Sequence, residues 1–386
     1  MKRVYLDYAA TTPVAPEVLA AMLPYFHDIS GNPSAIYAEG QQARQAVEAA
    51  RNAVARLINA RPDEIIFVSG GTEADNMALT GVVQAAGDKS CHIITSTIEH
   101  HAVLETCHWL EKQGVAVTIL PVDSDGFVDP AAVEKAIRPD TVLVSVIMAN
   151  NEIGVIQNIS EISRITRSAG IIFHTDAVQA FGRILVDVQA LGVDLLSISA
   201  HKLYGPKGVG ALYIRKGTRI SPILWGGGQE RGKRSGTENL PGIVGLGKAA
   251  ELTAASMTVE AERLTVLRDR LITGVLASIP GSRLNGHFIQ RLPNNANFSF
   301  DYVEGESVCL NLDLAGISAS PGSACSSTST APSHVLTALG LPKYQAFGSL
   351  RLSLGRWTDD KDVDRVFEVL PEVVSRLRAM SPMLRP

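Results

Sequence analysis

Short apolar runs alternate with amphipathic segments along the first two thirds of the chain. The apolar runs are nearly continuous and rich in β-branched residues, which is typical of strands covered on both faces. They predict strands at 64–69, 92–96, 115–122, 141–149, 170–177, 194–200 and 208–215. The amphipathic segments predict helices at 73–86, 101–113, 130–137 and 158–169. This alternation favours an α/β fold with a large, mostly parallel seven-stranded sheet and crossover helices.

The pattern changes near residue 240, where a long helical stretch rich in Ala, Leu, Glu and Arg runs to about residue 278. Beyond it we expect strands at 295–300 and 349–354 and helices at 304–315, 332–339 and 359–380. A chain of 386 residues has room for two domains. We therefore place a large domain at 15–255 and a small α+β domain at 1–14 and 256–386.

Composition removes several classes of function. The net charge is −4, from 35 basic and 39 acidic residues without a block of one sign, so nothing indicates direct nucleic-acid binding. No apolar stretch reaches 18 residues, and Asp7 interrupts the apolar start, so we expect neither a membrane span nor a signal peptide. Four cysteines without a C-x-x-C pair favour reduced thiols and a cytoplasmic location.

Polar side chains follow five of the predicted strands. In parallel α/β sheets, ligands bind beyond the carboxyl ends of the strands. The segments at those ends are "SGGTEADN" (69–76), "TIEHHAV" (97–103), "NNEIG" (150–154), "HTDAVQ" (174–179) and "SAHKLYGPKG" (199–208). Together they bring Gly, Thr, His, Asn, Asp, Gln, Ser and Lys to one edge of the sheet.

Three of these features suit a phosphorylated aldehyde cofactor. Gly71 and Thr72 open a helix whose N-terminus attracts an anion, although Thr72 also fits a plain N-cap. Lys202 follows a buried strand, where an amine becomes a nucleophile toward a carbonyl, although a lysine at a strand end is more often only a surface residue. Asp176 ends an apolar strand and needs a cationic partner, such as a protonated pyridine nitrogen.

Two other patterns lead to no site. "GGQERGKR" (227–234) matches G-x-x-x-x-G-K, but Arg234 stands where a P-loop needs Ser or Thr. His92, His100, His101 and His108 fit no usual zinc spacing. We expect no resident metal.

A set of motifs runs in order along almost the whole chain: "YLDYAATTP", "GNPSA", "SGGTEADN", "EHHAVLET", "NNEIGVIQ", "HTDAVQ", "SAHKLYGPKGVG", "RSGTEN" and "GSACSS…PSHVL". With these motifs the chain resembles the cysteine desulfurases of the iron–sulfur-cluster and nitrogenase-maturation type. They are class-V aminotransferase-like enzymes of pyridoxal-phosphate fold type I. The resemblance implies the aspartate-aminotransferase-like fold and pyridoxal 5′-phosphate as cofactor.

The resemblance also implies roles for single residues. Lys202 would hold the cofactor covalently, Asp176 would pair with its ring nitrogen, and Gln179 would donate to its phenolic oxygen. His100 would stack on the ring and transfer protons. The remaining cofactor contacts would be Gly71, Thr72, Ser199 and His201 at the phosphate, with Thr237 of "RSGT" reaching the phosphate of a second subunit in a homodimer. The substrate carboxylate of L-cysteine would meet Asn151 and Arg351.

Cys325 lies in a segment of small polar residues with little to bury it. By resemblance, its thiolate attacks the sulfur of L-cysteine, leaving alanine and a persulfide on Cys325. The persulfide would pass sulfur to an acceptor protein, such as an iron–sulfur scaffold, and any cluster contact would run through Cys325. A loop rich in Gly, Ser and Thr suits movement between two sites. Cys309 sits in an apolar helical pattern and is expected in the core.

One residue departs from the family pattern, since Tyr37 in "GNPSAIYAEG" stands where the family usually has histidine. Two alternatives stay open beside a desulfurase. One is another pyridoxal-phosphate enzyme of this fold, an aminotransferase or a selenocysteine lyase. The other is a non-catalytic dimer that carries sulfur.

Overall fold

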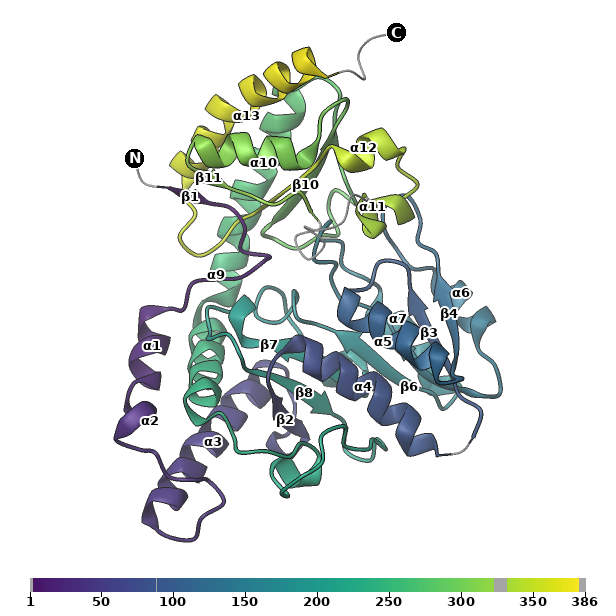
Figure 1. Cartoon of the computed structure of the whole chain (residues 1–386), viewed down its shortest axis with the longest axis vertical. Helices are drawn as coiled ribbons and strands as arrows, with labels where there is room; N and C mark the ends of the chain where they lie inside the picture. Colours follow the sequence, from purple (N-terminus) through teal and green to yellow (C-terminus); the bar gives the residue numbers. More distant parts are fainter. Residues whose placement is uncertain (1–2, 88, 323–331, 382–386) are drawn as a thin grey trace.

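The computed structural model describes residues 3–87, 89–322 and 332–381. Seven strands form one sheet, and in spatial order they are β2 (Ile65–Val68), β8 (Gly210–Ile214), β7 (Leu195–Ser199), β6 (Ile172–Asp176), β5 (Thr141–Ser145), β3 (His92–Ser96) and β4 (Ala116–Leu120). Only β8 runs against its neighbours in this sheet. The predicted mostly parallel seven-stranded sheet is confirmed (Figure 1).

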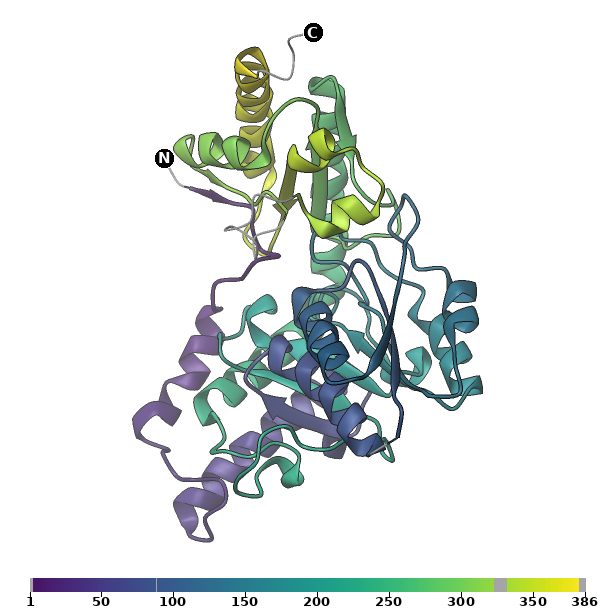
Figure 2. The same ribbon diagram turned by 45° about the vertical axis from the view of Figure 1, so that its right-hand side comes forward.

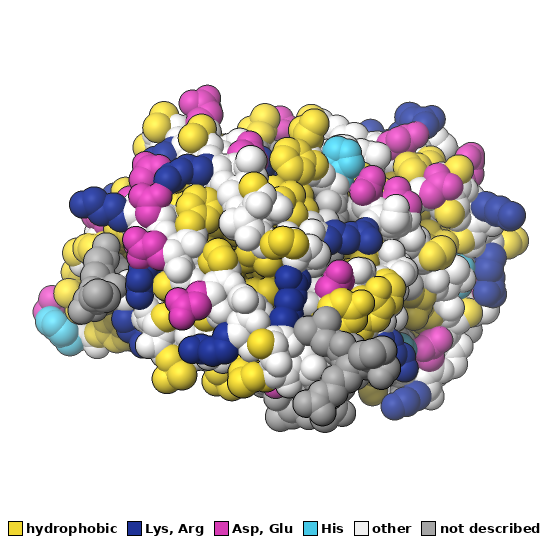
Figure 3. All heavy atoms as spheres, turned by 90° about the horizontal axis from the view of Figure 1, so that it is seen from above, with side chains coloured by type: hydrophobic (Ala, Val, Ile, Leu, Met, Phe, Trp, Pro, Cys, Tyr) yellow, Lys and Arg dark blue, Asp and Glu magenta, His cyan; other side chains and the backbone are white. Residues whose placement is uncertain are grey.

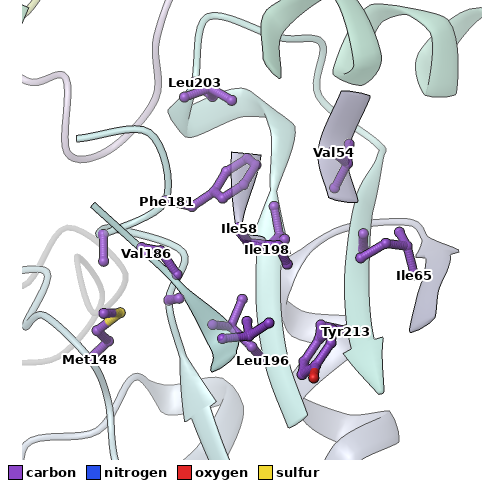
Figure 4. Close-up of a cluster of buried hydrophobic side chains, with 14 of the residues drawn as sticks. Val54, Ile58, Ile65, Met148, Phe181, Val186, Leu196, Ile198, Leu203 and Tyr213 are labelled. Atoms are coloured by element: carbon purple, nitrogen blue, oxygen red, sulfur yellow. The ribbon is translucent and has the colours of Figure 1, made fainter. Parts of the chain in front are cut away.

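Helices cover both faces of the sheet because its strands are apolar on both. Along β2, Ile65 and Phe67 join one apolar cluster while Ile66 and Val68 join the other, as the period of two requires. The second face is covered by α4 (Gly71–Ala86) and α5 (His101–Lys112). The first is covered by α1 (Pro16–Met22), α3 (Ala38–Leu57), α6 (Pro130–Ala136), α7 (Ile159–Ser168) and the start of α9 (Leu240–Ser278). Figure 4 shows side chains of α3, β2, β7 and β8 packed in this first cluster.

The two edges of the sheet are finished differently. The prediction that the strands are covered on both faces is wrong for β4, where Ile119 is 37% exposed. This strand pairs only with β3 within the described chain, and an edge strand leaves part of its surface to water. At the other edge, the Arg51 guanidinium donates to Ile65 O at 2.7 Å and Glu230 accepts from Phe67 N at 2.9 Å. This buried ion pair occupies the edge of β2 as a neighbouring strand would.

A second, smaller unit follows α9. Its antiparallel sheet has the order β12 (Ser349–Ser353), β10 (Asn295–Phe300) and β9 (Ser282–Leu284), covered by α10 (Gly305–Leu314) and α13 (Asp360–Met380). Helix α9 contributes residues up to Ala250 to the core of the large sheet and residues from Leu264 to the core of the small one. Figures 1 and 2 both show α9 running from one unit into the other. Our division near residue 255 stays a prediction.

Contacts outside α9 also join the two units. The short strands β1 (Val4–Tyr5) and β11 (Ile317–Ser318) pair in parallel, so the N-terminal segment starts on the small unit. Helices α11 (His334–Ala338) and α12 (Lys343–Phe347) pack against the segments that follow β3 and β5. The remaining short elements are α2 (Pro24–His27), η1 (Pro62–Glu64), α8 (Val188–Leu191), η2 (Ala200–Lys202) and η3 (Glu230–Gly232). On the face seen in Figure 3, acidic and basic side chains are interspersed.

Candidate active site

A cavity of about 400 Å³ lies beyond the carboxyl ends of β5, β6 and β7. The small unit closes it with Arg351 of β12 and Gly322, and the N-terminal segment adds Ala9 and Ala10. The predicted site residues that line it are Gly71, Thr72, His100, Asn151, Asp176, Gln179, Ser199, His201, Lys202 and Arg351. Two predicted residues are not among them. Thr237 lines a separate cleft together with Ser69 and Arg234, and Cys325 lies outside the described residues.

Lys202 is held at the end of η2, directly after β7. Its Nζ donates to Ala9 O and to Ala10 O, each at 2.6 Å. Gln179 Nε2 donates to the same Ala9 carbonyl at 2.9 Å. The carbonyls of "YAAT" therefore fix both side chains that were predicted to approach the cofactor ring.

Asp176 ends β6 and is almost completely buried. Its Oδ1 accepts from Val178 N at 2.8 Å. Burial raises the pKa of its carboxyl to about 6, against the opposing effects of the Val178 N–H group and the Lys202 charge. A carboxyl in this position gains most from a cation placed beside it.

A second carboxyl, Asp75, faces the same cavity from α4 and is 1% exposed. Within the described structure its Oδ1 has no hydrogen-bond partner, and His174 Nε2 lies 3.6 Å away. Burial and the charge of Asp176 raise its pKa well above the usual value, so Asp75 keeps its proton when Asp176 is ionised. Burial lowers the pKa of His174 to about 3 and keeps its ring neutral between Ser145 and Ser197.

His100 is the N-cap of α5, and its Nδ1 accepts from Ala102 N at 3.1 Å. Burial, then the charge of Lys202, lowers its pKa to about 4, so the ring is neutral at pH 7. Because Nδ1 is an acceptor, the single ring proton sits on Nε2. His201, which contacts Thr11 Oγ1 at 3.1 Å, is also neutral, since burial lowers its pKa to about 4.

The N-terminus of α4 opens on the cavity with Gly71 and Thr72. A Cβ at Gly71 would lie 2.7 Å from Val178 Cγ2, so the turn requires glycine for packing. The first bond of the helix joins Ala74 N to Gly70 O, which leaves the N–H groups of the first turn for an anion. Glu73 in that turn is paired with Arg234, whose Nε lies 2.8 Å from Glu73 Oε1.

Arg351 is 2% exposed and forms two bonds across the cavity wall. Its Nη1 donates to Asn151 O and its Nη2 to Asp7 Oδ1, both at 2.8 Å. Its Nε has no hydrogen-bond partner within the described residues. A buried, charged guanidinium with one N–H left over suits a carboxylate ligand.

Described residues on both sides of the segment that carries Cys325 line the cavity. Gly322 precedes it and His334 follows it, and both line the cavity. Ser333 donates to Glu152 Oε2 at 2.6 Å, and the His334 ring packs on His101 with centroids 4.7 Å apart. His334 Nε2 also donates to Glu99 O at 3.0 Å.

The aminotransferase class-V family matches residues 4–366 of the chain. A cysteine desulfurase IscS of Dictyoglomus turgidum is 57% identical over 383 residues, covering 99% of this chain and 97% of the relative. The chain belongs to the class-V aminotransferases, among the cysteine desulfurases. A solved NifS-like protein matches with a TM-score of 0.91 at 38% identity, covering 97% of this chain and 100% of that protein. SspA, solved in complex with cysteine, matches with a TM-score of 0.81 at 38% identity, covering 91% of this chain and 98% of that protein.

For this desulfurase, the predicted resemblance and fold type are confirmed. The described residues contain no cluster of three His, Cys, Asp or Glu side chains that could hold a metal ion. In the same residues, no helix has the length and apolar character needed to span a membrane. Tyr37 is 59% exposed at the start of α3, away from the cavity.

Sequence reasoning missed several residues that line the desulfurase cavity. Asp75 and Glu152 stand inside the motifs "SGGTEADN" and "NNEIG", but the motifs gave no sign that these carboxyls are buried. Ala9 and Ala10 belong to "YLDYAATTP", whose place beside the sheet edge follows only from the fold. Asp7 of the same motif does not line the cavity but pairs with Arg351, which does. The signal that could have found them is the motif itself, which lies before the first expected strand or helix.

Proposed function

We propose that this desulfurase uses pyridoxal 5′-phosphate to convert L-cysteine to L-alanine and delivers the sulfur as a persulfide on Cys325. The observation that carries the proposal is the meeting of the Lys202 amine, the buried Asp176 carboxyl and the N-terminus of α4 at one cavity. One or two of these groups would not specify a ligand. A single molecule that carries an aldehyde, a pyridine nitrogen and a phosphate would engage all three of them.

The residues fit this cofactor. Lys202 would hold its aldehyde carbon, Asp176 its ring nitrogen, and the first turn of α4 with Ser199 and His201 its phosphate. When bound, the cofactor supplies an electron sink for the carbanion formed at the substrate Cα. Because burial raises the pKa of Asp176, a cationic ring nitrogen beside it would stabilise its ionised form. The neutral imidazoles of His100 and His201 add no competing positive charge.

Substrate orientation falls to the other wall. Arg351 would bind the carboxylate of L-cysteine through Nε and an Nη group, giving up its bond to Asn151 O or Asp7. Two parallel N–H donors fix the plane of a carboxylate as well as its position. Because its neutral ring carries its only proton on Nε2, His100 would donate a hydrogen bond to the substrate from that atom. To take a substrate proton through Nε2, the ring would adopt its other tautomer, with the proton on Nδ1 and without the hydrogen bond from Ala102 N.

Cys325 completes the reaction. Its thiolate sulfur forms a bond to the substrate sulfur, and the substrate C–S bond breaks with its electron pair remaining on the substrate carbon. Protonation of that carbon yields alanine, while Cys325 retains the second sulfur as a persulfide. Gly322 before its segment and His334 after it both line the cavity, which supports access of Cys325 to the bound substrate.

We further propose a homodimer in which Thr237 serves the phosphate site of the second subunit. Thr237 does not line the cavity of its own chain. Large apolar side chains exposed on the large unit offer a surface for association, and they are Leu19, Leu23, Phe26, Ile36, Leu224 and Trp225. The name IscS of the relatives favours an iron–sulfur scaffold as acceptor. Free thiols at Cys91, Cys107 and Cys309 are consistent with action in the cytoplasm.

The test compares two variants with the wild-type protein. Incubation with L-cysteine and a thiol reductant should release alanine and sulfide in equal amounts. Lys202→Ala should lose the visible absorption of bound cofactor and all turnover. Cys325→Ser should keep the absorption but lose the persulfide, which alkylation and mass spectrometry detect.

The matched control is Cys309→Ser. Burial raises the pKa of the Cys309 thiol to about 12, so this cysteine stays protonated and unreactive and its replacement should preserve turnover. Sulfide release at the wild-type rate from Cys325→Ser would remove Cys325 from the reaction. A requirement for a 2-oxo acid, with pyruvate as product, would instead identify an aminotransferase.

A further inference from the structure

A second cavity, of about 590 Å³, lies beside the middle of α9. Its walls are residues 183–185 after β6, the α9 residues between Met257 and Asp269, and residues 288–293 before β10. It shares no lining residue with the active site. Its volume falls within the range of small-molecule sites, roughly 300–1,000 Å³.

Three arginines line this second cavity, and each is nearly buried. Arg183 and Arg268 are 5% exposed and Arg291 is 3% exposed. Arg268 pairs with Asp269 at 2.7 Å, whereas Arg291 donates to backbone carbonyls such as Ile153 O. No acidic side chain of the described chain forms an ion pair with Arg183 or Arg291.

The result is excess positive charge in a poorly hydrated wall. Burial, and then the charge of Arg268, lowers the pKa of Arg291 to about 9, which reflects a cation without adequate compensation. Arg183 Nε is also buried without a hydrogen-bond partner in the described structure. Glu262 is the other acidic lining residue and lies exposed at the mouth. An anion that enters the cavity would meet a stronger field than at the surface.

Around the arginines the cavity is apolar. Leu185 and Ile289 on its rim are 75% and 78% exposed, and Phe288 is 49% exposed. Exposed leucine and isoleucine side chains that flank one concave surface gain stability when an apolar group covers them. The cavity therefore combines a cationic base with an apolar rim, which matches a ligand with one anionic end.

Arg183 also contacts the active site. Its Nη2 donates to Lys202 O at 3.0 Å, and its guanidinium carbon lies 5.8 Å from the centroid of the Tyr204 ring. The same side chain thus lines the second cavity and holds the backbone of the cofactor lysine. An anion that draws on the N–H groups of Arg183 competes with the Lys202 carbonyl for them.

We propose that this cavity binds a small monoanion with an apolar body, of the medium-chain carboxylate class, and that the bound anion slows turnover through Arg183. A single carboxylate matches the uncompensated arginine charge, and an aliphatic chain covers Leu185 and Ile289. The site shares no lining residue with the cavity proposed for L-cysteine, and none of the apolar residues proposed for the homodimer contact lines it.

Calorimetric titration of the holoenzyme with octanoate tests binding. We expect one saturable site per chain and affinity about tenfold higher for octanoate than for octanol, as one added ion pair gives. Thr265→Phe fills the cavity from α9 and should abolish this binding, with Ala261→Phe as a second filling variant. Val266→Phe is the matched control, since Val266 is 68% exposed on the same helix and does not line the cavity.

Arg183→Gln separates charge from structure. It should reduce the preference for octanoate over octanol to about unity, which a merely structural role of Arg183 would not do. Octanoate should also inhibit turnover partially and saturably. Half of this inhibition should occur at the octanoate concentration that half-saturates binding, and the inhibition should be absent from Thr265→Phe. The site is overturned if the wild-type protein shows no saturable binding of octanoate, or if both filling variants bind octanoate as tightly as the wild-type protein does. Inhibition that persists in Thr265→Phe overturns its link to Arg183.

Discussion

Single buried side chains in this site hold protonation states that they would not hold in water. Glu99, behind His100, is completely buried, and burial raises its pKa to about 8. Ser96 and Ile147 donate to its Oε1, while its Oε2 has no partner within the described residues. A carboxyl that is neutral at pH 7 next to neutral His100 keeps the cavity floor from repelling an ionised Asp176.

Replacement of Glu99 by Gln should change how stability depends on pH. Between its unfolded pKa of 4.5 and its folded pKa of about 8, native Glu99 holds a proton that the unfolded chain has released. Its contribution to stability is therefore complete below about pH 4.5 and is lost as pH rises through 8. The unfolding free energy of the wild-type protein, relative to Glu99→Gln, should fall by about 1.4 kcal/mol per pH unit in that window. Urea unfolding at several pH values between 5 and 8 measures it.

The control for this experiment is Glu368→Gln, whose side chain is 64% exposed and should leave the pH profile unchanged. Parallel profiles for wild type and Glu99→Gln would mean that Glu99 is ionised in the folded protein.

At this scale the sequence identifies residues whose chemistry shows in their type and place, such as Lys202 after a strand and Asp176 at the end of one. It does not identify Glu99, Asp75 or Glu152, because their behaviour depends on burial, and burial depends on the packing of distant segments. In the sequence, a carboxylate inside a strand-end motif is as consistent with an exposed position as with a buried one.

At the scale of elements, two opposite electrostatic effects meet at the N-terminus of α4. Its free N–H groups favour an anion, but Glu73 places a carboxylate in the same turn. Arg234 resolves this conflict, since its Nε and Nη2 lie 2.8 and 3.3 Å from the two Glu73 oxygens. Burial acts to raise the pKa of Glu73, but these contacts, with an N–H donated by Ser69, outweigh it, so the pKa is lowered and Glu73 stays ionised and paired.

Loss of this neutralisation should weaken phosphate binding. In Arg234→Gln, the unpaired Glu73 charge repels a phosphate at the same helix end, and we expect affinity for pyridoxal 5′-phosphate to fall about three- to tenfold. Titration of apoprotein by absorbance measures it. The double variant Glu73→Gln/Arg234→Gln should recover most of the affinity, and binding of pyridoxal without phosphate should be unchanged in all variants. Equal weakening for pyridoxal would show that Arg234 acts on the fold instead of the phosphate.

Periodicity predicted the existence and type of the main elements well, because strands of the large sheet are apolar along their whole length and α9 has no breaker in its middle. It could not distinguish β4 from the inner strands, since an edge strand carries the same residue types as its neighbours. It also could not show that Arg51 and Glu230 finish the edge of β2, because these residues are 179 positions apart.

At the scale of the whole molecule, the cavity exists only because distant parts of the chain meet. The ion pair between Asp7 and Arg351 joins residues 344 positions apart, and α11 returns from the small unit to pack beside His101. No local pattern predicts such contacts, so the cavity wall opposite the sheet could be anticipated only through resemblance to a family. Among the predicted site residues that the structure describes, Thr237 is the one that does not line the cavity of its own chain.

A mixed dimer decides whether Thr237 acts within its own chain or across subunits. Co-expression of Lys202→Ala and Thr237→Val chains with different affinity tags gives a dimer with one Lys202. If the site is shared, Thr237 of the other chain completes the site that contains this Lys202. That site should then bind pyridoxal 5′-phosphate with wild-type affinity, at one cofactor per dimer. The Thr237→Val homodimer should bind about tenfold more weakly at both sites, as loss of one charge-assisted hydrogen bond implies. Weak binding in the mixed dimer as well would assign Thr237 to its own chain.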